Sequence, residues 1–281
     1  VSRAQDRLGV RIELLEPSGA EDREASLRLF SARGFDLVIG VGFIFSTDIN
    51  VVARDFPATK FACVDYAPTP GATIPGNVVG LGFREEEGSF LVGAVAGLMT
   101  KTKHLGFVGG MDIPLIHRFE AGYRAGMKMV CAECELHVGY AGTTPEAFRD
   151  PAKGKAVAIS QIAAGADIIY HASGTTGHGV FEAARDMGVK AIGVDSDQYD
   201  EMPGTVVTSM IKRVDVAVFD TIAAVGYGKF KSGMRSFGVA ESGVDYVHEG
   251  PHGALVPDPV KREVERLRGR IARGEISIPR R

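Results

Sequence analysis

The sequence predicts an α/β protein in which helices cover both faces of parallel sheets. Three observations lead to this prediction. Short apolar runs of strand length recur along the chain, as in residues 36–42 and 60–65. Segments with helical periodicity separate most of these runs, and this alternation produces parallel sheets. The length of 281 residues suits one large α/β domain or two lobes.

The composition describes an ordinary folded protein. Hydrophobic residues make up 45% of the chain and charged residues 24%, which is enough to bury a full core. The net charge of −3 leaves no positive excess to hold phosphate backbones, so we expect no nucleic-acid partner. The longest apolar stretches run to about ten residues, half the length of a membrane crossing.

The amino-terminal region predicts three elements. Residues 1–9 are typical of the end of a helix that stops at Gly9, and residues 11–16 have the pattern of a strand. Ser18, with Glu21 three positions later, forms a capping box for a helix that ends at Gly34. A strand normally precedes the first helix of such a lobe. We therefore expect about 30 residues of a further βα unit, and any signal peptide, to precede the first residue.

The rest of the chain continues the alternation. Asp150 before Pro151 opens a helix that Gly165 closes. Gly93 and Gly97, one turn apart, predict close packing of a helix over residues 85–100. The polar segment 101–104 is a plausible lobe boundary. Further strands are expected at residues 36–42, 60–65, 77–83, 104–110, 167–172, 190–195 and 205–210.

The cysteines and the sequence motifs give no catalytic or metal-binding set. We expect Cys63, Cys131 and Cys134 to be inert, with a local disulfide between the last two as the alternative. His248 and His252 match a zinc-binding pattern, but Gly250-Pro251 between them prevents the helix that this pattern needs. No nucleophile and base pair stands out, so we expect no enzyme activity, no cofactor and no metal.

Candidate binding residues follow the predicted strands. Phe43, Asp112 and Asp195 stand where strands end, and Gly177 lies in a glycine-rich turn before a helix whose first turn contains Phe181. Open α/β sheets bind ligands outside the carboxyl ends of their strands. An aromatic ring and carboxylates suit a polar, ring-bearing small molecule.

Three of these candidates also have a structural alternative. The glycine-rich turn could be only a tight connection between strand and helix, and Phe181 could belong to the core. Asp112 could be the N-cap of a helix that begins near Pro114.

Six segments of the chain follow one another with the spacing of a known family: residues 83–93, 106–116, 119–123, 174–181, 193–198 and 208–213. Through them the chain resembles the basic membrane protein family of ABC-transporter substrate-binding lipoproteins, which includes purine nucleoside receptors. The similarity runs in order from about residue 10 to 278. It implies a type I periplasmic-binding fold, with two lobes joined by crossing strands and a ligand held between them.

The resemblance also implies roles for individual residues. Phe181 would stack on the base, Asp195 would hold ribose hydroxyls, and Lys212 would lie beside the ribose. Asp112 would read the base edge. A solvated lysine at a strand end is the alternative for Lys212. The family's first strand, with a second aromatic residue and a base contact, would precede this chain, so the first lobe's part of the site is incomplete.

The implied fold divides the chain into two discontinuous lobes. The first would comprise residues 1–103 and 210–237, and the second residues 104–209 and 238–281, with a carboxy-terminal helix over 260–274.

The implied function is that of a monomeric receptor that passes a purine nucleoside to a membrane permease. The receptor would lie in the periplasm or on the outer face of the cytoplasmic membrane, anchored by lipid through a segment before the first residue. The alternatives are a ligand-sensing regulatory domain of the same fold and a nucleoside hydrolase. The preferred base, and ligands such as riboflavin, stay open.

Overall fold

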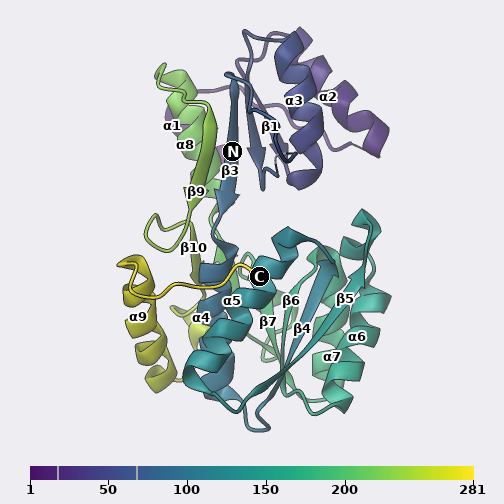
Figure 1. The fold of residues 1–281 in the computed structure, drawn as a ribbon, viewed down its shortest axis with the longest axis vertical. Helices are drawn as coiled ribbons and strands as arrows, with labels where there is room; N and C mark the ends of the chain where they lie inside the picture. Colours follow the sequence, from purple (N-terminus) through teal and green to yellow (C-terminus); the bar gives the residue numbers. More distant parts are fainter. Residues whose placement is uncertain (18, 68) are drawn as a thin grey trace. The chain divides into compact units, whose positions relative to one another are not determined.

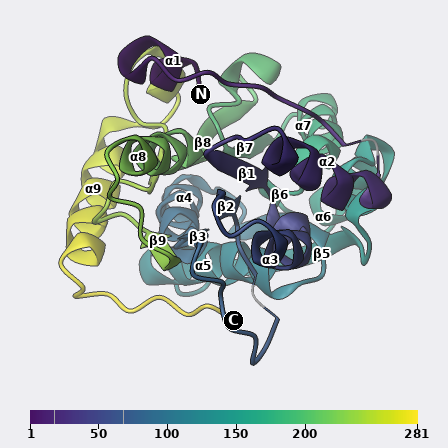
Figure 2. The ribbon, with the colours of Figure 1, turned by 90° about the horizontal axis from the view of Figure 1, so that it is seen from above.

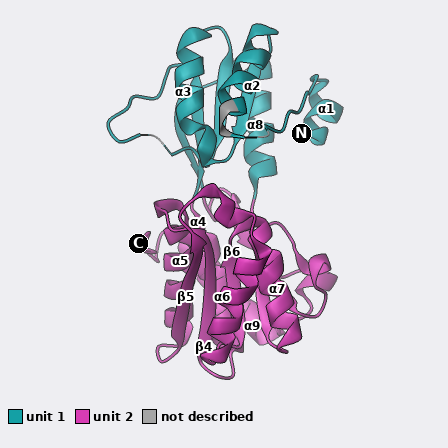
Figure 3. Ribbon diagram, turned by 90° about the vertical axis from the view of Figure 1, so that its right-hand side faces the viewer, with its two compact units in different colours: residues 1–83, 213–237 teal, residues 84–212, 238–281 magenta. Residues whose placement is uncertain are grey.

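The protein is described here by a computed structural model that covers residues 1–17, 19–67 and 69–281. The chain forms two compact units, shown in separate colours in Figure 3. The first contains residues 1–83 and 213–237, and the second residues 84–212 and 238–281. Each unit is built around a mainly parallel sheet with helices on its faces, which confirms the predicted α/β class.

The first unit has a four-stranded sheet in the order β1-β2-β3-β9. All three pairings are parallel. Aliphatic and aromatic residues dominate these strands, and β2 and β3 are almost wholly buried. The strands are β1 (Leu37–Val41), β2 (Lys60–Val64), β3 (Val78–Phe83) and β9 (Gly233–Phe237).

Helices complete the first unit. Helices α2 (Ala20–Ala32) and α3 (Ser46–Asp55) pack on one face of the sheet, where Leu27, Ile49 and Phe61 share a core. Figure 2 shows these two helices side by side. Helix α8 (Val214–Gly226) also belongs to this unit. Helix α1 (Ser2–Leu8) contacts α8 and ends at Gly9, as predicted, in the left-handed conformation that glycine favours.

The predicted strand over residues 11–16 is wrong. Within the described parts of the chain, this segment pairs with no strand. Leu14 is 81% exposed, so the segment's apolar residues gain little from burial. Glu13 instead contacts the guanidinium groups of Arg11 and Arg33. The predicted capping box includes Ser18, which lies outside the described residues, whereas the helix that follows ends before Gly34 as expected.

The second unit has a six-stranded sheet in the order β10-β8-β7-β6-β4-β5. Every pairing is parallel except that of β10 with β8. The strands are β4 (His104–Met111), β5 (Glu135–Gly142), β6 (Ile168–Ala172), β7 (Lys190–Asp195), β8 (Val206–Lys212) and β10 (Val244–Tyr246).

Helices cover both faces of this second sheet (Figure 1). Along β4, Phe107 packs toward Tyr123 of α5 (Pro114–Val130), while its neighbour Gly106 faces Gln161 of α6 (Pro151–Ala163). This alternation follows from the two-residue period of a strand. Helix α7 (Gly177–Asp186) packs beside α6, while α9 (Asp258–Ala272) packs on α4 (Glu85–Met99).

The first crossing between the units follows Phe83, about twenty residues before the expected boundary at 103. The reason is the tight packing of α4 against α5 within the second unit. A Cβ atom at Gly93 would overlap the Tyr123 carbonyl group, and one at Gly126 would overlap the Phe90 carbonyl group. Gly93, for which close packing was predicted, and Gly126 therefore bring the two backbones together and tie α4 to the second unit. The later crossings follow Lys212 and Phe237.

The cysteine pair forms the disulfide that the sequence left as the alternative. Helix α5 ends at Val130, and the following turn brings the Cα atoms of Cys131 and Cys134 within 5.4 Å of each other. The expectation that these two cysteines are inert thiols is therefore wrong. Cys63 is fully buried, and burial raises the pKa of its thiol to about 12.

The helix contact predicts a selective effect of alanine substitutions. Gly126→Ala should lower the free energy of unfolding by about 1–3 kcal/mol, because the new methyl group meets a backbone carbonyl that cannot rotate away. Gly226→Ala is the control, since a Cβ there meets no atom within 4 Å. It should be neutral or stabilising by up to about 1 kcal/mol. Urea denaturation measures both, and equal effects of the two substitutions would contradict the packing.

Candidate functional site

The second sheet gathers charged side chains at the carboxyl ends of its strands. Asp112 follows β4, while Asp195 and Lys212 are the last residues of β7 and β8. Parallel pairing links β4 to β6, β6 to β7 and β7 to β8, so these strand ends share one edge. We call this the carboxyl edge. It is the position at which open α/β sheets bind ligands.

Lys212 and Asp195 form an ion pair at this edge. The Nζ atom of Lys212 lies 3.6 Å from Oδ1 of Asp195. The lysine side chain is 6% exposed and the aspartate side chain 52%, so a buried cation lies under an accessible carboxylate. Phe119 of α5 also lies below the amine, with its ring centroid 5.9 Å from Nζ. The pair places a fixed positive charge beside a carboxylate that can accept two hydroxyl hydrogen bonds.

The backbone of Asp195 is left-handed, with a φ of 66°. Non-glycine residues rarely adopt this conformation, although aspartate and asparagine tolerate it better than most. Neighbouring residues hold this turn. The side-chain Oε1 atom of Gln198 accepts a hydrogen bond from the Val194 backbone amide, and the backbone amide of Gln198 donates to Ser209 Oγ. Backbone strain of this kind tends to cluster at functional sites. The neighbouring hydrogen bonds therefore hold the backbone of Asp195 in this conformation at the end of β7.

Asp112 pairs with a histidine that the sequence did not single out. His117, near the start of α5, lies 2.7 Å from Asp112 through its Nε2 atom. The Asp112 side chain is 55% exposed. The His117 ring meets the Tyr140 ring edge to face at 5.7 Å. The Asp112 carboxylate can accept hydrogen bonds from a ligand, and the His117 imidazole lies beside it. Asp112 is not the residue before α5, because that position belongs to Ile113.

A buried hydrogen-bond chain supports the loops behind this edge. His171 Nε2 donates to Gln198 Oε1 over 3.0 Å, which leaves His171 Nδ1 to accept from Ser173 Oγ at 3.3 Å. A Cβ atom at Gly177 would overlap the His171 ring. The buried Gly177 is thus needed for packing, which agrees with the structural alternative for the glycine-rich turn. Burial lowers the pKa of His171 to about 4, so the ring is neutral at pH 7.

Phe181 lies in the core and not on the carboxyl edge. Its side chain is fully buried in a cluster with Ala184, Ala191 and Val206. Its ring also meets the His171 ring edge to face, with centroids 4.9 Å apart. A ligand could stack on Phe181 only by displacing core contacts. The structure therefore does not support the stacking role, because the first turn of α7 directs this side chain inward.

The first unit has an aromatic residue at its own carboxyl edge. Phe43 begins a 3-10 turn (Phe43–Phe45) directly after β1 and is half-buried. Near it in the sequence, Val41 is 63% exposed and Ile44 37% exposed, so this strand end presents apolar side chains to solvent. A shallow hollow of about 550 Å³ in the same unit lies elsewhere, between Lys60 and Ser232 at the amino ends of the strands. The hollow contains none of the predicted site residues.

Sequence reasoning missed His117, Phe119 and the His171 chain. His117 stands five positions after Asp112, and this spacing could have signalled the contact. Phe119 reaches Lys212 only through the packing of α5 on the sheet, for which the sequence has no local signal. A three-donor cluster suited to a metal ion lies, among the described residues, at the opposite edge of the sheet.

Comparisons with known proteins agree with this geometry. A family model described as "ABC transporter substrate-binding protein PnrA-like" matches residues 1–281. A CD4+ T-cell-stimulating antigen of Listeria monocytogenes is 36% identical over 282 residues, covering 94% of this chain and 76% of the relative. An uncharacterized lipoprotein of Pyrococcus horikoshii is 35% identical over 254 residues, covering 87% and 62%. Basic membrane protein A of Borreliella burgdorferi is 32% identical over 276 residues, covering 96% and 78%.

Solved structures show the same fold. An ABC-transporter solute-binding protein from Aeropyrum pernix superposes with a TM-score of 0.85 at 28% identity, covering 100% of this chain and 87% of that one. This match confirms the predicted type I periplasmic-binding fold. Within the described part of the chain, no helix is both long enough and apolar enough to cross a membrane.

The buried His171 predicts a pH dependence of stability. Its pKa is about 4 in the folded protein and about 6.5 in the unfolded chain, so the unfolded state takes up the proton first as pH falls. The free energy of unfolding should therefore decrease between pH 6.5 and pH 4, by an amount on the order of 3 kcal/mol from this group.

Urea denaturation across this pH range, on the native protein and on His171→Gln, isolates the effect from that of the carboxylates. The difference between the two proteins should shrink as pH falls. Parallel profiles would contradict the neutral, buried histidine.

Proposed function

Because this chain belongs to the Bmp family of PnrA-like ABC-transporter substrate-binding proteins, we propose that it binds a purine nucleoside and delivers it to a membrane permease. The family and the fold make it a substrate-binding protein, for which a small-molecule ligand and a permease partner are implied. The identity of the ligand as a purine nucleoside is our proposal. The ion pair of Asp195 and Lys212 at the carboxyl edge is the observation on which it rests.

The chemistry of this edge suits a sugar that carries adjacent hydroxyl groups. Asp195 can accept from two hydroxyls, and the separation of 3.6 Å from Lys212 is longer than a direct hydrogen bond. The carboxylate therefore has acceptor capacity to spare for a ligand. Asp112 offers a second exposed carboxylate to the N–H groups of a base. We propose Asp112, Asp195 and Lys212 as ligand-binding residues of the second unit and Phe43 as one of the first.

We further propose that the protein binds its ligand without converting it. Ser173 and His171 have the types of a nucleophile and a base, and their side chains lie 3.3 Å apart. Both side chains are fully buried, however, and His171 is neutral with its Nε2 proton engaged by Gln198. Neither group can reach a molecule bound at the edge.

The relatives support a position outside the cytoplasm. The protein from Pyrococcus horikoshii is named as a lipoprotein, and that from Borreliella burgdorferi as a basic membrane protein. The disulfide between Cys131 and Cys134 agrees with this, because such bonds persist mainly in oxidising compartments. We propose a lipid-anchored, monomeric receptor in the periplasm or at the outer face of the cytoplasmic membrane.

Asp195→Asn should weaken nucleoside binding by about 10-fold to 150-fold, the value of a charge-assisted hydrogen bond of about 1.5–3 kcal/mol. Asparagine tolerates the left-handed backbone, so the loop is preserved. Asp197→Asn is the matched control, because Asp197 pairs instead with His252 at 2.6 Å. Calorimetry with guanosine, inosine, 2′-deoxyguanosine and guanine measures both variants. Free guanine should bind both equally.

Equal losses for base and nucleoside in Asp195→Asn would reject the ribose contact. Failure of the native protein to bind any nucleoside, with a response to riboflavin or a sugar in the same series, would reject the ligand class. Release of free base during prolonged incubation with inosine, in proportion to the protein added, would show that the protein is a hydrolase.

A further inference from the structure

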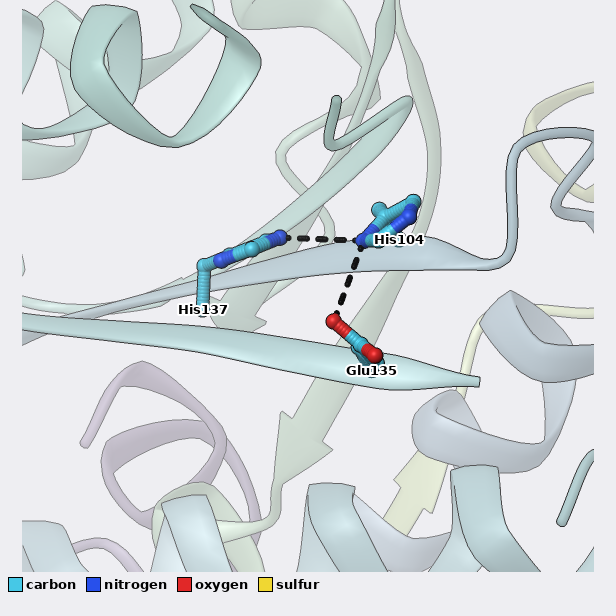
Figure 4. Close-up of side chains that lie close together, drawn as sticks. All are labelled: His104, Glu135 and His137. Atoms are coloured by element: carbon cyan, nitrogen blue, oxygen red, sulfur yellow. Dashed lines mark hydrogen bonds and ion pairs between the residues drawn. The ribbon is translucent and has the colours of Figure 1, made fainter. Parts of the chain in front are cut away.

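A cluster of two histidines and a glutamate lies at the amino ends of β4 and β5, on the opposite edge of the second sheet from the proposed ligand site. His104 begins β4, while Glu135 and His137 lie two residues apart at the start of β5. The register pairs His104 with Glu135 and Gly106 with His137. Since side chains two positions apart share a face, all three lie on the same side of the sheet. Figure 4 shows their donor atoms converging.

Two of the three donor separations are close to those around a small divalent ion. His104 Nδ1 lies 3.2 Å from His137 Nε2 and 3.6 Å from Glu135 Oε2. One donor atom from each of the three residues lies within 4.8 Å of the others. A tetrahedral zinc ion with bonds of about 2.0–2.1 Å holds its ligands about 3.3–3.4 Å apart. The two shorter separations therefore need to change by only a few tenths of an ångström.

The surroundings hold the cluster in place. The disulfide of Cys131 and Cys134 ends directly before Glu135, whose amide donates to the Lys103 carbonyl over 2.8 Å. On the other strand, Asp167 accepts hydrogen bonds from the Lys101 and Thr102 amides in the turn before His104. Hydrogen bonds and the disulfide thus hold the two segments that precede β4 and β5. This lowers the entropy cost of binding an ion.

The local charges also favour a cation. Glu135 is 68% exposed and His104 36% exposed, so an ion can enter from solvent. The nearest lysine in the sequence, Lys103, is paired with Glu133 at 2.9 Å. Gly165, just past the carboxyl end of α6, lies against the His104 ring, since a Cβ there would be 3.4 Å from the ring Cδ2 atom. The carboxyl end of a helix carries partial negative charge.

We propose that His104, Glu135 and His137 form a zinc site, with water in the fourth position. Two imidazole nitrogens and one carboxylate oxygen are a ligand set that zinc uses. The ion would join β5, the edge strand of the sheet, to its neighbour β4, in addition to their backbone hydrogen bonds. This site is independent of the ligand-binding residues, which lie at the other ends of the strands.

Calorimetric titration of the chelator-treated, disulfide-intact protein with zinc chloride tests the proposal. The native protein should bind one zinc ion per chain at this site. His137→Ala and Glu135→Gln should each weaken that binding by more than about 100-fold, since loss of even an outer-shell contact costs about 10-fold to 100-fold. Glu135→Gln keeps the size of an exposed side chain, so it tests the site without a change in packing.

His252→Gln is the matched control. His252 also lies beside two carboxylates, but they contact opposite ring nitrogens, Asp197 at Nδ1 and Asp200 at Nε2, and so cannot share one ion with it. This variant should bind zinc like the native protein. Zinc should also raise the melting temperature of the native protein and of His252→Gln, but not of His137→Ala.

Cobalt substitution gives a second measurement. Cobalt bound to the native protein should show the intense visible absorption of tetrahedral coordination, and this band should be absent in His137→Ala. Native-like zinc affinity in His137→Ala or Glu135→Gln would overturn the proposal. So would the absence of zinc binding and of a shift in melting temperature for the native protein.

Discussion

The parallel pairing of the second sheet is the constraint on which the functional geometry depends. Because β4, β6, β7 and β8 run in the same direction, residues that are far apart in sequence meet at two opposite edges. The ends of the strands bring Asp195 and Lys212 to one edge, and their beginnings bring His104 to the other. A strand reversed within this sheet would separate the charges that the proposed ligand site combines.

The parallel arrangement is supported by helices that pack unusually close to one another. In the second unit, Gly126 of α5 allows contact with the backbone of α4, and Gly179 of α7 allows contact with the Pro151 carbonyl of α6. The glycine-rich turn at the start of α7 also allows close packing. The sequence placed Gly177 of this turn among the candidate ligand contacts, but Gly177 makes room for the buried His171 ring. Packing at this turn therefore supports the site from behind and does not form it.

The sequence predicted the buried strands well, because a strand covered on both faces is a continuous apolar run. Strand β5 was missed, since it lies at the sheet edge, is half-buried and contains glycines that break the apolar pattern. Strand β9 was missed for a similar reason, with exposed Met234 and Ser236 among its five residues. The error at residues 11–16 was of the opposite kind. The sequence has residues typical of a strand there, but the segment pairs with no strand of the described chain.

Prediction of the site was limited by contacts between distant residues. Strand ends are visible in the sequence, so Asp112 and Asp195 could be placed at the carboxyl edge. Whether an aromatic residue near the start of a helix faces a ligand or the core depends on the packing around it. The side chain of Phe181 lies in the core. The pairing of His104 with Glu135 depends on the register of two strands separated by a helix.

Hydrogen–deuterium exchange of the native protein, with and without a saturating purine nucleoside, tests most directly whether the carboxyl edge of the second sheet binds the ligand. When the nucleoside is bound, amides in segments 112–117 and 195–198, and around residue 212, should become protected. Amides at the amino ends of the same strands, at residues 104 and 135–137, should exchange at unchanged rates. Protection confined to the amino ends, or no protection at the carboxyl edge while the nucleoside is bound, would contradict the account.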